Sequence, residues 1–505
     1  MLWVDEIPAF RRLMKSSEVR MKIGELLRDE RDIRLIGSFE QIVEGLSFNS
    51  KETRPGDLFF AVAGNNADGC AFVGEALERG AVAVAAQREL ALPASVPLLL
   101  VDDVRRAKAR LASTFYGFPS RRLKCIGVTG TNGKTTTSHM LKSILEQNGW
   151  SVGLLGTIHH LVGKETIRAR TTTPDTIEIH RYLARMIDEN QDAAVMEVSS
   201  HALHQARVEA VAFQAGVFTN LSAEHLDYHG GIDNYRRTKA RLFAALPDSS
   251  TAILNGDDES SGFMKEACRC PVLSYGVDVD AQVRGIIRRL DIDGFSMILK
   301  SPAGEVDVTS RLLGRYNVSN ALAAAAAALS LGVSLPAVKS GLEALRAVPG
   351  RVETIDLGQD FRVIVDYAHT DDALRKLLEN LRELTRGRLI TVFGCGGDRD
   401  AFKRPRMAAA ATELSDLTVI TSDNPRSEDP RIIIDDILAG CREKAPIKVL
   451  PDRRAAIELA ISLARGGDIV AIAGKGHEDY QILNSGTIEF DDREVAREAI
   501  WKRSL

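Results

Sequence analysis

Residues 129–136, TGTNGKTT, constrain the fold of this chain more than any other stretch. They follow an apolar run at 125–128, which predicts a strand, and precede a run at 138–146 that is typical of a helix. A strand, a glycine loop and a helix in this order form a cradle for phosphate, because backbone N–H groups and the positive end of the helix converge on the loop. The sequence therefore predicts an α/β nucleotide-binding fold around this loop.

Two side chains of the loop carry the chemistry expected there. Lys134 is placed to reach the β- and γ-phosphates, and the Thr135 hydroxyl to bind Mg²⁺. The loop is shorter than the common GxxxxGK form, since Val128 occupies the position of its first glycine. The alternative, a glycine turn that happens to carry a lysine, is disfavoured because GKTT is intact and both flanks fit. We predict an ATP site formed by Gly130, Thr131, Asn132, Gly133, Lys134, Thr135 and Thr136.

Composition excludes several classes of protein. A net charge of −4 provides no basic excess for binding nucleic acid. No apolar stretch approaches the roughly 18 residues of a membrane span, and the N-terminus lacks the apolar core of a signal peptide. The six cysteines are scattered without a CxxC pair, which favours reduced thiols in a cytoplasmic protein.

A chain of 505 residues is too long for one core, and its patterns predict three α/β domains. Apolar runs alternate with helical patterns, which favours a small N-terminal α/β domain and two doubly wound, mostly parallel sheets. The third domain is Rossmann-like. The segment MKIGELL from Met21 resembles the beginning of a protein chain. The first twenty residues are therefore interpreted as an appendage or as the result of a misplaced start codon. The predicted boundaries are 1–20 for this extension, 21–118, 119–350 and 351–505.

Polar clusters follow the predicted strands of the third domain. The strands are expected at 361–365, 389–393, 417–421 and 469–473, and the clusters at 366–369, 394–400, 422–430 and 474–478. Because parallel sheets bind ligands beyond the carboxyl ends of their strands, the third domain is predicted to be a binding domain.

Two further clusters follow strands of the central domain, predicted at 193–198 and 215–219. Glu197 ends the first strand, and His225 lies beside Asp227 after the second. Carboxylate oxygens with an occasional imidazole suit Mg²⁺–ATP chemistry. The alternative for His225 alone is a hydrogen-bonded loop histidine, and His159 and His160 are interpreted as surface or core residues.

Four ordered motifs resemble those of the Mur ligases, cytoplasmic enzymes of peptidoglycan precursor synthesis. They are TGTNGKTT at 129–136, TTTPD at 171–175, MEVSSH at 196–201 and HLDYHG at 225–230. The resemblance extends from residue 21 nearly to the C-terminus. It implies three domains, which bind in turn a UDP-linked substrate, ATP with Mg²⁺, and an amino acid.

The resemblance assigns substrate and metal contacts by position. Glu197 and His225 match Mg²⁺ ligands. Lys239 matches a carbamylated lysine that holds a second Mg²⁺, although from the residues alone it would be a solvated lysine on a basic helix. The usual DSR of the family is NSK here, at 49–51. The implied contacts to the UDP-MurNAc-dipeptide are Phe48, Ser50, Asn65, Asn66, Ala67, Thr172, Thr173, Ser199, Gln205 and Arg207.

Further ATP contacts are implied at the start of an alanine-rich helix and in the third domain. Asn317 and Asn320 match a segment near the adenine, with helix capping as the alternative. Arg351 matches an arginine that reaches the phosphates. Asp366 and His369 belong to the family motif DYAHTP, in which Asp371 replaces the proline here.

Amino-acid selectivity is implied for the loop 423–426, DNPR. In the family, arginine at the position of Arg426 accompanies meso-2,6-diaminopimelate, whose extra carboxylate a guanidinium can hold with two hydrogen bonds. Glu478 would pair with the distal ammonium. The alternative is a plain surface turn. The implied contacts are Arg399, Asp423, Asn424, Pro425, Arg426, Gly474 and Glu478.

The resemblance implies an ATP-dependent, amide-forming ligase. It would activate the D-glutamate carboxylate of UDP-MurNAc-L-Ala-D-Glu as an acyl phosphate and join it to meso-diaminopimelate. The expected partners are small molecules only, and the expected state is a monomer in the cytoplasm. The alternatives are the same ligation with L-lysine, a folylpolyglutamate-synthase-like enzyme, or a phosphate-loop ATPase switch without ligase activity.

Overall fold

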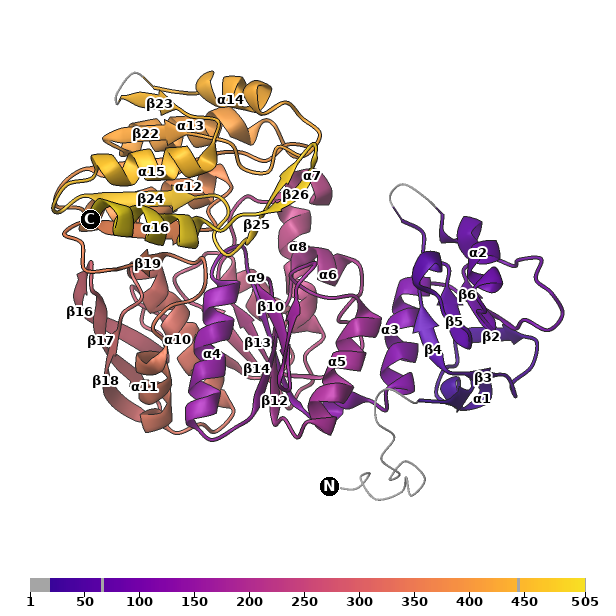
Figure 1. Cartoon of the computed structure of the whole chain (residues 1–505). Helices are drawn as coiled ribbons and strands as arrows, with labels where there is room; N and C mark the ends of the chain where they lie inside the picture. The colour runs from indigo at the N-terminus through magenta and orange to yellow at the C-terminus, as the bar shows by residue number, and fades with distance from the viewer. Residues whose placement is uncertain (1–18, 65–67, 443–445, 505) are drawn as a thin grey trace. The chain divides into compact units, whose positions relative to one another are not determined.

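The computed structural model describes residues 19–64, 68–442 and 446–504 and forms two compact units. One unit runs to Val283 and includes Ala323–Val338. The other holds Arg284–Leu322 and the chain from Lys339 onward. Figure 1 colours both units along the chain. The predicted domain boundaries at 20, 118 and 350 remain predictions.

The first part of unit one is a small α/β sheet in the order β2-β7-β6-β5-β4. Strands β4 to β7 are parallel, and β2 joins antiparallel at the edge. Alternate side chains of β5 face opposite cores, so that Leu58 packs with α1 and α3 while Phe59 packs with α2. The elements are β1 (Met21–Lys22), α1 (Ile23–Leu26), β2 (Ile33–Ile36), β3 (Ile42–Val43), β4 (Gly45–Ser47), η1 (Ser50–Glu52), β5 (Asp57–Phe60), η2 (Gly69–Phe72), α2 (Val73–Glu78), β6 (Ala83–Ala86), β7 (Leu98–Val101) and α3 (Val104–Phe115).

The second part of unit one is a larger sheet in the order β11-β10-β9-β12-β8-β13-β14-β15. The strands from β9 to β15 in this order are parallel, and β10 and β11 add an antiparallel edge. The elements are η3 (Pro119–Arg121), β8 (Lys124–Thr129), α4 (Lys134–Gln147), β9 (Val152–Leu155), β10 (His159–Val162), β11 (Glu165–Arg168), α5 (Thr176–Asp188), β12 (Ala193–Glu197), α6 (Ser200–His204), β13 (Phe213–Phe218), α7 (Leu226–His229), α8 (Ile232–Ala244), β14 (Thr251–Asn255), α9 (Ser261–Ala267) and β15 (Val272–Gly276).

The position of β8 determines where the site forms. It lies between β12 and β13, so the loops that follow these three parallel strands meet at one edge of the sheet. Helix α4 packs against β8, β9 and β12, while α5, α6, α8 and α9 contribute to the core on the other face. The predicted strands at 125–128, 193–198 and 215–219 are confirmed to within about two residues. The antiparallel edge was not predicted.

Unit two contains an antiparallel meander that sequence analysis did not predict, followed by an open sheet in the order β19-β20-β24-β21-β22-β23. Strands β20 to β24 are parallel, and β19 is antiparallel. The remaining elements of the chain are β16 (Val283–Asp291), β17 (Gly294–Ser301), β18 (Gly304–Ser310), α10 (Arg315–Ser330), α11 (Leu335–Ala344), β19 (Glu353–Ile355), β20 (Arg362–Asp366), α12 (Asp371–Leu384), β21 (Leu389–Phe393), α13 (Lys403–Leu414), β22 (Leu417–Ile420), α14 (Pro430–Leu438), β23 (Ile447–Val449), α15 (Arg453–Leu463), β24 (Ile469–Ala473), β25 (Tyr480–Leu483), β26 (Gly486–Glu489) and α16 (Asp492–Ser504).

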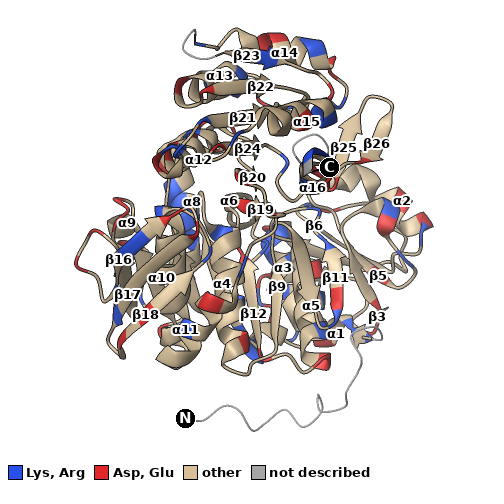
Figure 2. Ribbon diagram, turned by 60° about the vertical axis from the view of Figure 1, so that its left-hand side comes forward, with Lys and Arg blue, Asp and Glu red and all other residues tan. Residues whose placement is uncertain are grey.

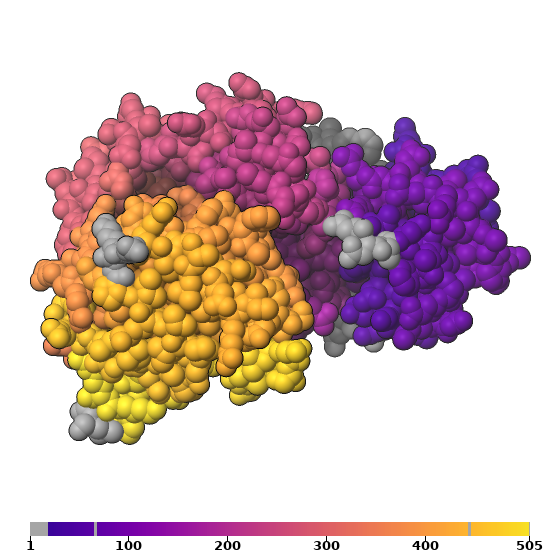
Figure 3. All heavy atoms as spheres, turned by 90° about the horizontal axis from the view of Figure 1, so that it is seen from above, coloured from indigo at the N-terminus to yellow at the C-terminus, as the bar shows by residue number. Residues whose placement is uncertain are grey.

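Two helical layers cover this open sheet. Helices α12, α13 and α14 pack on one face, and α15 and α16 on the other. Because β24 lies between β20 and β21, residues distant in sequence share one surface, and orange and yellow atoms adjoin in Figure 3. The four predicted strands of this region are confirmed, and the alanine-rich run is a buried part of α10, as expected.

Basic and acidic residues are mixed on the surface, for example on α14 in Figure 2. None of the helices in the described part of the chain is long and apolar enough to cross a membrane.

Candidate nucleotide and amino-acid sites

The phosphate loop has the predicted strand–loop–helix geometry. Gly133 has φ +85° and lies directly before α4, and Gly130 has φ +149°. A Cβ at position 130 would collide with Oγ1 of Thr219, so only glycine fits this backbone position. Both glycines are therefore required by the shape of the cradle.

The loop is anchored to the residues that follow β13. The backbone N–H of Thr131 donates to the Asn220 carbonyl at 2.8 Å, and that of Asn132 donates to Asn220 Oδ1 at 3.0 Å. The Thr219 hydroxyl donates to the Asn132 carbonyl at 2.6 Å. No role was predicted for Thr219 or Asn220 from the sequence. The feature of the sequence that could have indicated their role is that these two polar residues directly follow a buried strand.

Lys134 lies over the loop, where its ammonium donates to the carbonyls of Gly130 at 3.0 Å and Thr131 at 2.7 Å. These contacts hold the positive charge against the backbone of the phosphate loop. The predicted role of Lys134 requires that position.

Glu197 is fully buried and contacts Thr135, another of the predicted metal ligands, directly. Its Oε2 accepts hydrogen bonds at 2.9 Å from the hydroxyls of Thr135 and Thr157, and its Oε1 accepts one from the Thr157 N–H at 2.9 Å. The carboxylate and hydroxyl oxygens at the loop suit Mg²⁺, which usually takes one or two protein ligands together with phosphate oxygens. Thr157 was not predicted to belong to the site, because no recognised sequence motif precedes it.

No group of three or more His, Cys, Asp or Glu side chains in the described ranges is arranged to hold a metal ion by itself. Thr135 and Glu197 are the two predicted metal ligands that a hydrogen bond joins at the loop.

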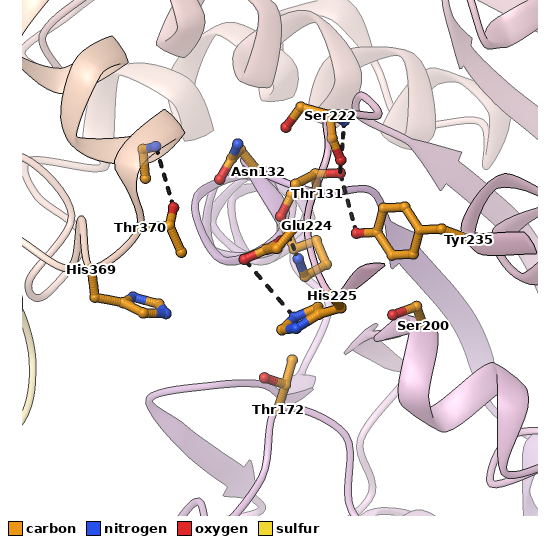
Figure 4. Close-up of polar contacts among 12 residues, drawn as sticks. Thr131, Asn132, Thr172, Ser200, Ser222, Glu224, His225, Tyr235, His369 and Thr370 are labelled. Carbon is orange, nitrogen blue, oxygen red and sulfur yellow. Dashed lines mark hydrogen bonds and ion pairs between the residues drawn. The ribbon is translucent and has the colours of Figure 1, made fainter. Parts of the chain in front are cut away.

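His225 lies beside the loop at the start of α7, with φ +54°. Its Nε2 is 3.9 Å from Oε1 of Glu224, and Figure 4 shows the two side chains pointing toward each other below Thr131. The Thr131 hydroxyl is 3.2 Å from the Tyr235 hydroxyl. The structure thus places His225 near Thr131 of the phosphate loop.

Lys239 is almost completely buried on α8, so its interpretation as a solvated lysine is wrong. Its ammonium donates to the Gly130 carbonyl at 2.8 Å and lies 4.4 Å from the centroid of the Tyr235 ring. Burial, with a smaller effect of nearby Lys134, lowers the pKa of Lys239 well below the usual value of lysine. The error arose because the helix is basic in sequence, whereas packing turns this residue inward.

The five central residues predicted to contact the dipeptide gather in one hydrogen-bonded cluster. Thr173 donates to the Glu197 carbonyl at 2.8 Å and accepts from the Ser199 N–H at 3.0 Å. Arg207 donates to the Thr173 carbonyl at 2.7 Å and to Gln205 Oε1 at 2.7 Å and 3.1 Å.

Thr172 completes this cluster, because its hydroxyl accepts from the Thr157 hydroxyl at 3.3 Å. Tyr228, which sequence analysis did not single out, accepts from Gln205 Nε2 at 3.2 Å and contacts the His204 ring nitrogen at 2.9 Å. Metal-binding and substrate-binding candidates therefore share one network.

The predicted UDP contacts are only partly described. Phe48 is exposed, with its ring centroid 4.0 Å from the ammonium of Lys108, a buried lysine that donates to Asp175 at 2.6 Å. Ser50 is buried and donates to Glu75 at 2.6 Å. The predicted contacts Asn65, Asn66 and Ala67 lie outside the described residues.

The predicted ATP residues of unit two form two groups. Asp366 accepts hydrogen bonds at 2.8 Å from the N–H groups of Val352 and Ala368. Burial raises the pKa of Asp366, and the Arg351 charge opposes this shift. The Arg351 guanidinium lies 4.7 Å from the centroid of the Tyr367 ring.

The other group is buried in the first turns of α10. Asn317 donates to the Leu313 carbonyl at 2.7 Å and accepts from Asn320 at 3.0 Å. These contacts are not those of an N-cap, whose side-chain oxygen accepts from a backbone N–H, so the capping interpretation is wrong for Asn317.

His369 and Lys403 lie close in unit two, where the Lys403 ammonium donates to the His369 carbonyl at 2.8 Å. The His369 ring nitrogen Nδ1 is 2.8 Å from the Tyr367 carbonyl.

The loops that follow β21, β22 and β24 bring the amino-acid candidates together. Arg426, with φ +55°, donates through Nη1 to the carbonyls of Gly397 at 2.7 Å and Asn424 at 3.3 Å. Gly474 has φ +119°, and a Cβ there would lie 2.7 Å from Asp423 Oδ2. Arg399 is exposed and donates to the Asp398 carbonyl at 3.1 Å.

Lys475 is a residue of this site that sequence analysis missed. It is fully buried, and its ammonium contacts Asn424 Oδ1 at 3.1 Å and Glu478 Oε2 at 3.0 Å. The signal was a lysine between two glycines at the end of a buried strand, GKGHE at 474–478.

A phosphate loop lies at the centre of a parallel sheet, and the hydroxyl of its Thr135 donates to the buried carboxylate of Glu197. This arrangement defines an α/β nucleotide-binding enzyme. Three family matches give its class. Residues 42–116 match the Mur ligase family catalytic domain, residues 128–328 the Mur ligase middle domain, and residues 350–476 the Mur ligase glutamate ligase domain. The chain belongs to the Mur ligase family.

Relatives and a solved structure match nearly the whole chain. Two curated relatives are named UDP-N-acetylmuramoyl-L-alanyl-D-glutamate–2,6-diaminopimelate ligase. The one from Syntrophomonas wolfei is 44% identical, covering 95% of this chain and 99% of its own length. The one from Gloeobacter violaceus is 46% identical, covering 96% and 99%. A solved structure of the same name has a TM-score of 0.68 at 32% identity and covers 96% of this chain and 99% of its own.

Proposed function

We propose that this chain is the ATP-dependent ligase that adds meso-2,6-diaminopimelate to the D-glutamate of UDP-MurNAc-L-Ala-D-Glu in peptidoglycan precursor synthesis. The observation that carries the proposal is the match, over nearly the full length, to relatives of that name. The geometry of the phosphate loop and of the Arg426 loop agrees with it.

The reaction joins a carboxylate to an amine, and a carboxylate is inert to amines at neutral pH. The γ-carboxylate of D-glutamate attacks the γ-phosphate of ATP, which releases ADP and leaves an acyl phosphate. The amine of diaminopimelate then adds to the acyl carbon, and phosphate departs. The chain's own task is to orient these groups and to offset negative charge, so no nucleophilic side chain is required.

Lys134 offsets charge on the phosphates from its position over the loop. Thr135 and Glu197 would hold Mg²⁺, with His225 as a further ligand, and the ion would neutralise charge on the transferring phosphoryl group. Asn317, Arg351 and Asp366 are the candidates for contacts to the rest of the nucleotide.

A carbamate at Lys239 is supported by its burial. Burial lowers the pKa of Lys239 well below the usual value of lysine, which favours the neutral amine, and the neutral amine is the form that adds to CO₂. The carbamate would carry a negative charge and would provide oxygen ligands for a second Mg²⁺.

The UDP-linked substrate would lie along the first unit, from Phe48 and Ser50 to the cluster around Thr173 and Arg207. The guanidinium of Arg207, positioned by Gln205, suits a carboxylate of the dipeptide. We propose a monomer that works on small molecules in the cytoplasm.

Diaminopimelate would bind in the second unit. Nη1 is the one guanidinium nitrogen of Arg426 with a hydrogen-bond acceptor among the described residues, so Nε and Nη2 are available to a second carboxylate. L-Lysine lacks that carboxylate and would leave these donors unsatisfied.

The test measures ADP release with Mg²⁺–ATP and UDP-MurNAc-L-Ala-D-Glu, adding meso-diaminopimelate, L-lysine or no amino acid, for the wild type and for Arg426→Ala. Release that depends on diaminopimelate and falls in the variant is expected. Release with lysine alone would contradict the selectivity argument but not the ligase. ADP release that depends on neither the UDP-linked substrate nor the amino acid would indicate an ATPase switch instead of a ligase.

A further inference from the structure

Lys475 is a buried charge in the amino-acid site. It follows β24, between Gly474 and Gly476, whose φ values of +119° and +53° turn the chain sharply on both sides. Its side chain is 0% exposed. Burying an ammonium is costly unless it is paired and hydrogen-bonded, and both of its acceptors belong to residues predicted to bind the amino acid.

The contacts of Lys475 determine which oxygen of Glu478 remains available. Oε2 of Glu478 accepts from the Asn424 amide at 2.9 Å and from Lys475 at 3.0 Å. In the described part of the chain no donor reaches Oε1. The carboxylate is therefore held with one oxygen engaged and the other open to a ligand ammonium.

The same contacts hold the Asn424 side chain. Its Oδ1 accepts from Lys475 and from the Ile482 N–H at 2.9 Å, while its amide donates to Glu478. Asn424 is two residues from Arg426, whose guanidinium donates to the Asn424 carbonyl. Lys475 thus supports both the ammonium-binding end and the carboxylate-binding end of the site.

Charge gives Lys475 an influence on selectivity. With Lys475 paired to it, Glu478 attracts a ligand ammonium less strongly than an unpaired carboxylate would. A diamino acid with a second carboxylate recovers binding energy at Arg426. A diamino acid with a net positive charge, such as L-lysine, does not.

We propose that Lys475 is a specificity-determining positioning residue, which orients Glu478 and excludes cationic diamino acids by compensating its charge. The proposal rests on the proposed ligase function. The competing account is a purely structural lysine that holds the loop 474–478. That account predicts equal losses for every amino acid.

The experiment uses Lys475→Met, which removes the charge and the donors, and Lys475→Gln, which keeps a donor without the charge. Lys448→Met, an exposed lysine on β23, is the matched control. The kcat and KM for meso-diaminopimelate and L-lysine are measured by ADP release at saturating ATP and UDP-linked substrate, and folding is checked by circular dichroism.

For Lys475→Met we expect a KM for diaminopimelate raised about tenfold, with kcat nearly unchanged. The ratio of kcat/KM for diaminopimelate over lysine should fall at least about tenfold, which a single charge pair at contact distance can supply. For Lys475→Gln the KM for diaminopimelate should stay closer to wild type while the ratio still falls. The control should leave both quantities unchanged.

The proposal would be overturned if the ratio of kcat/KM for diaminopimelate over lysine stayed at the wild-type value in both Lys475 variants. It would also be overturned if neither Lys475 variant folded. A wild type without diaminopimelate-dependent ADP release would overturn the proposed function itself. That result is visible before any variant is made, so the two failures are distinguishable.

Discussion

The buried ion pair of Arg453 and Asp492 offers a sharp test of how the amino-acid site is supported. Both side chains are 0% exposed and make two hydrogen bonds of 2.7 Å with each other. Arg453 also donates to the carbonyls of Ser422 at 3.3 Å and Ala473 at 3.1 Å. These carbonyls directly precede the loops that begin with Asp423 and Gly474.

The perturbation is Asp492→Asn, which keeps the shape of the side chain and removes its charge. Breaking a buried pair leaves an uncompensated guanidinium, and such changes cost about 3–5 kcal/mol of unfolding free energy. The matched control is Glu498→Gln, because Arg454 and Glu498 join the same two helices at side-chain exposures of 45% and 52%. The control should cost less than about 1 kcal/mol.

The assay is urea denaturation, followed by circular dichroism, of both variants and of the double variant Arg453→Met/Asp492→Leu. The double variant should recover much of the loss, since an apolar pair replaces the ionic one. An Asp492→Asn variant no less stable than Glu498→Gln would refute the reasoning. The KM for diaminopimelate should also rise in Asp492→Asn, because both loops lose their common support.

Three further outcomes are expected. Gly130→Ala should abolish nucleotide binding in calorimetry, since its Cβ would collide with Thr219. Glu197→Gln should raise the Mg²⁺ concentration needed for half-maximal ADP release, because a neutral amide is a poorer ligand than a carboxylate; an unchanged Mg²⁺ dependence would exclude Glu197 as a ligand. Burial lowers the pKa of His180 to about 3, so below pH 6.5 the unfolded chain gains a proton that the native one does not. The unfolding free energy should then fall by about 1.4 kcal/mol per pH unit down to the native pKa, and denaturation of His180→Leu at pH 7 and pH 5 should show a smaller fall.

Local patterns were sufficient for the phosphate loop and for several of the parallel strands, although the parallel strands β9, β15 and β23 were not predicted. A fully buried strand is a continuous apolar run, and the runs at 125–128, 389–393 and 469–473 could be recognised by that property alone. The loop glycines indicate a backbone conformation that other residues rarely adopt. The antiparallel strands β10, β11 and β16 to β18 escaped because their half-exposed faces mix polar and apolar residues.

The sequence by itself determined the class of the fold, the phosphate loop and the family. Only the tertiary structure showed that Thr135 and Glu197 are in contact, because they are 62 residues apart and meet through the pairing of β8 with β12. The tertiary structure also showed that Lys239 and Lys475 are buried. Whether a lysine is solvated or buried depends on what packs around it, and burial with pairing is a property of long-range contacts that no local pattern contains.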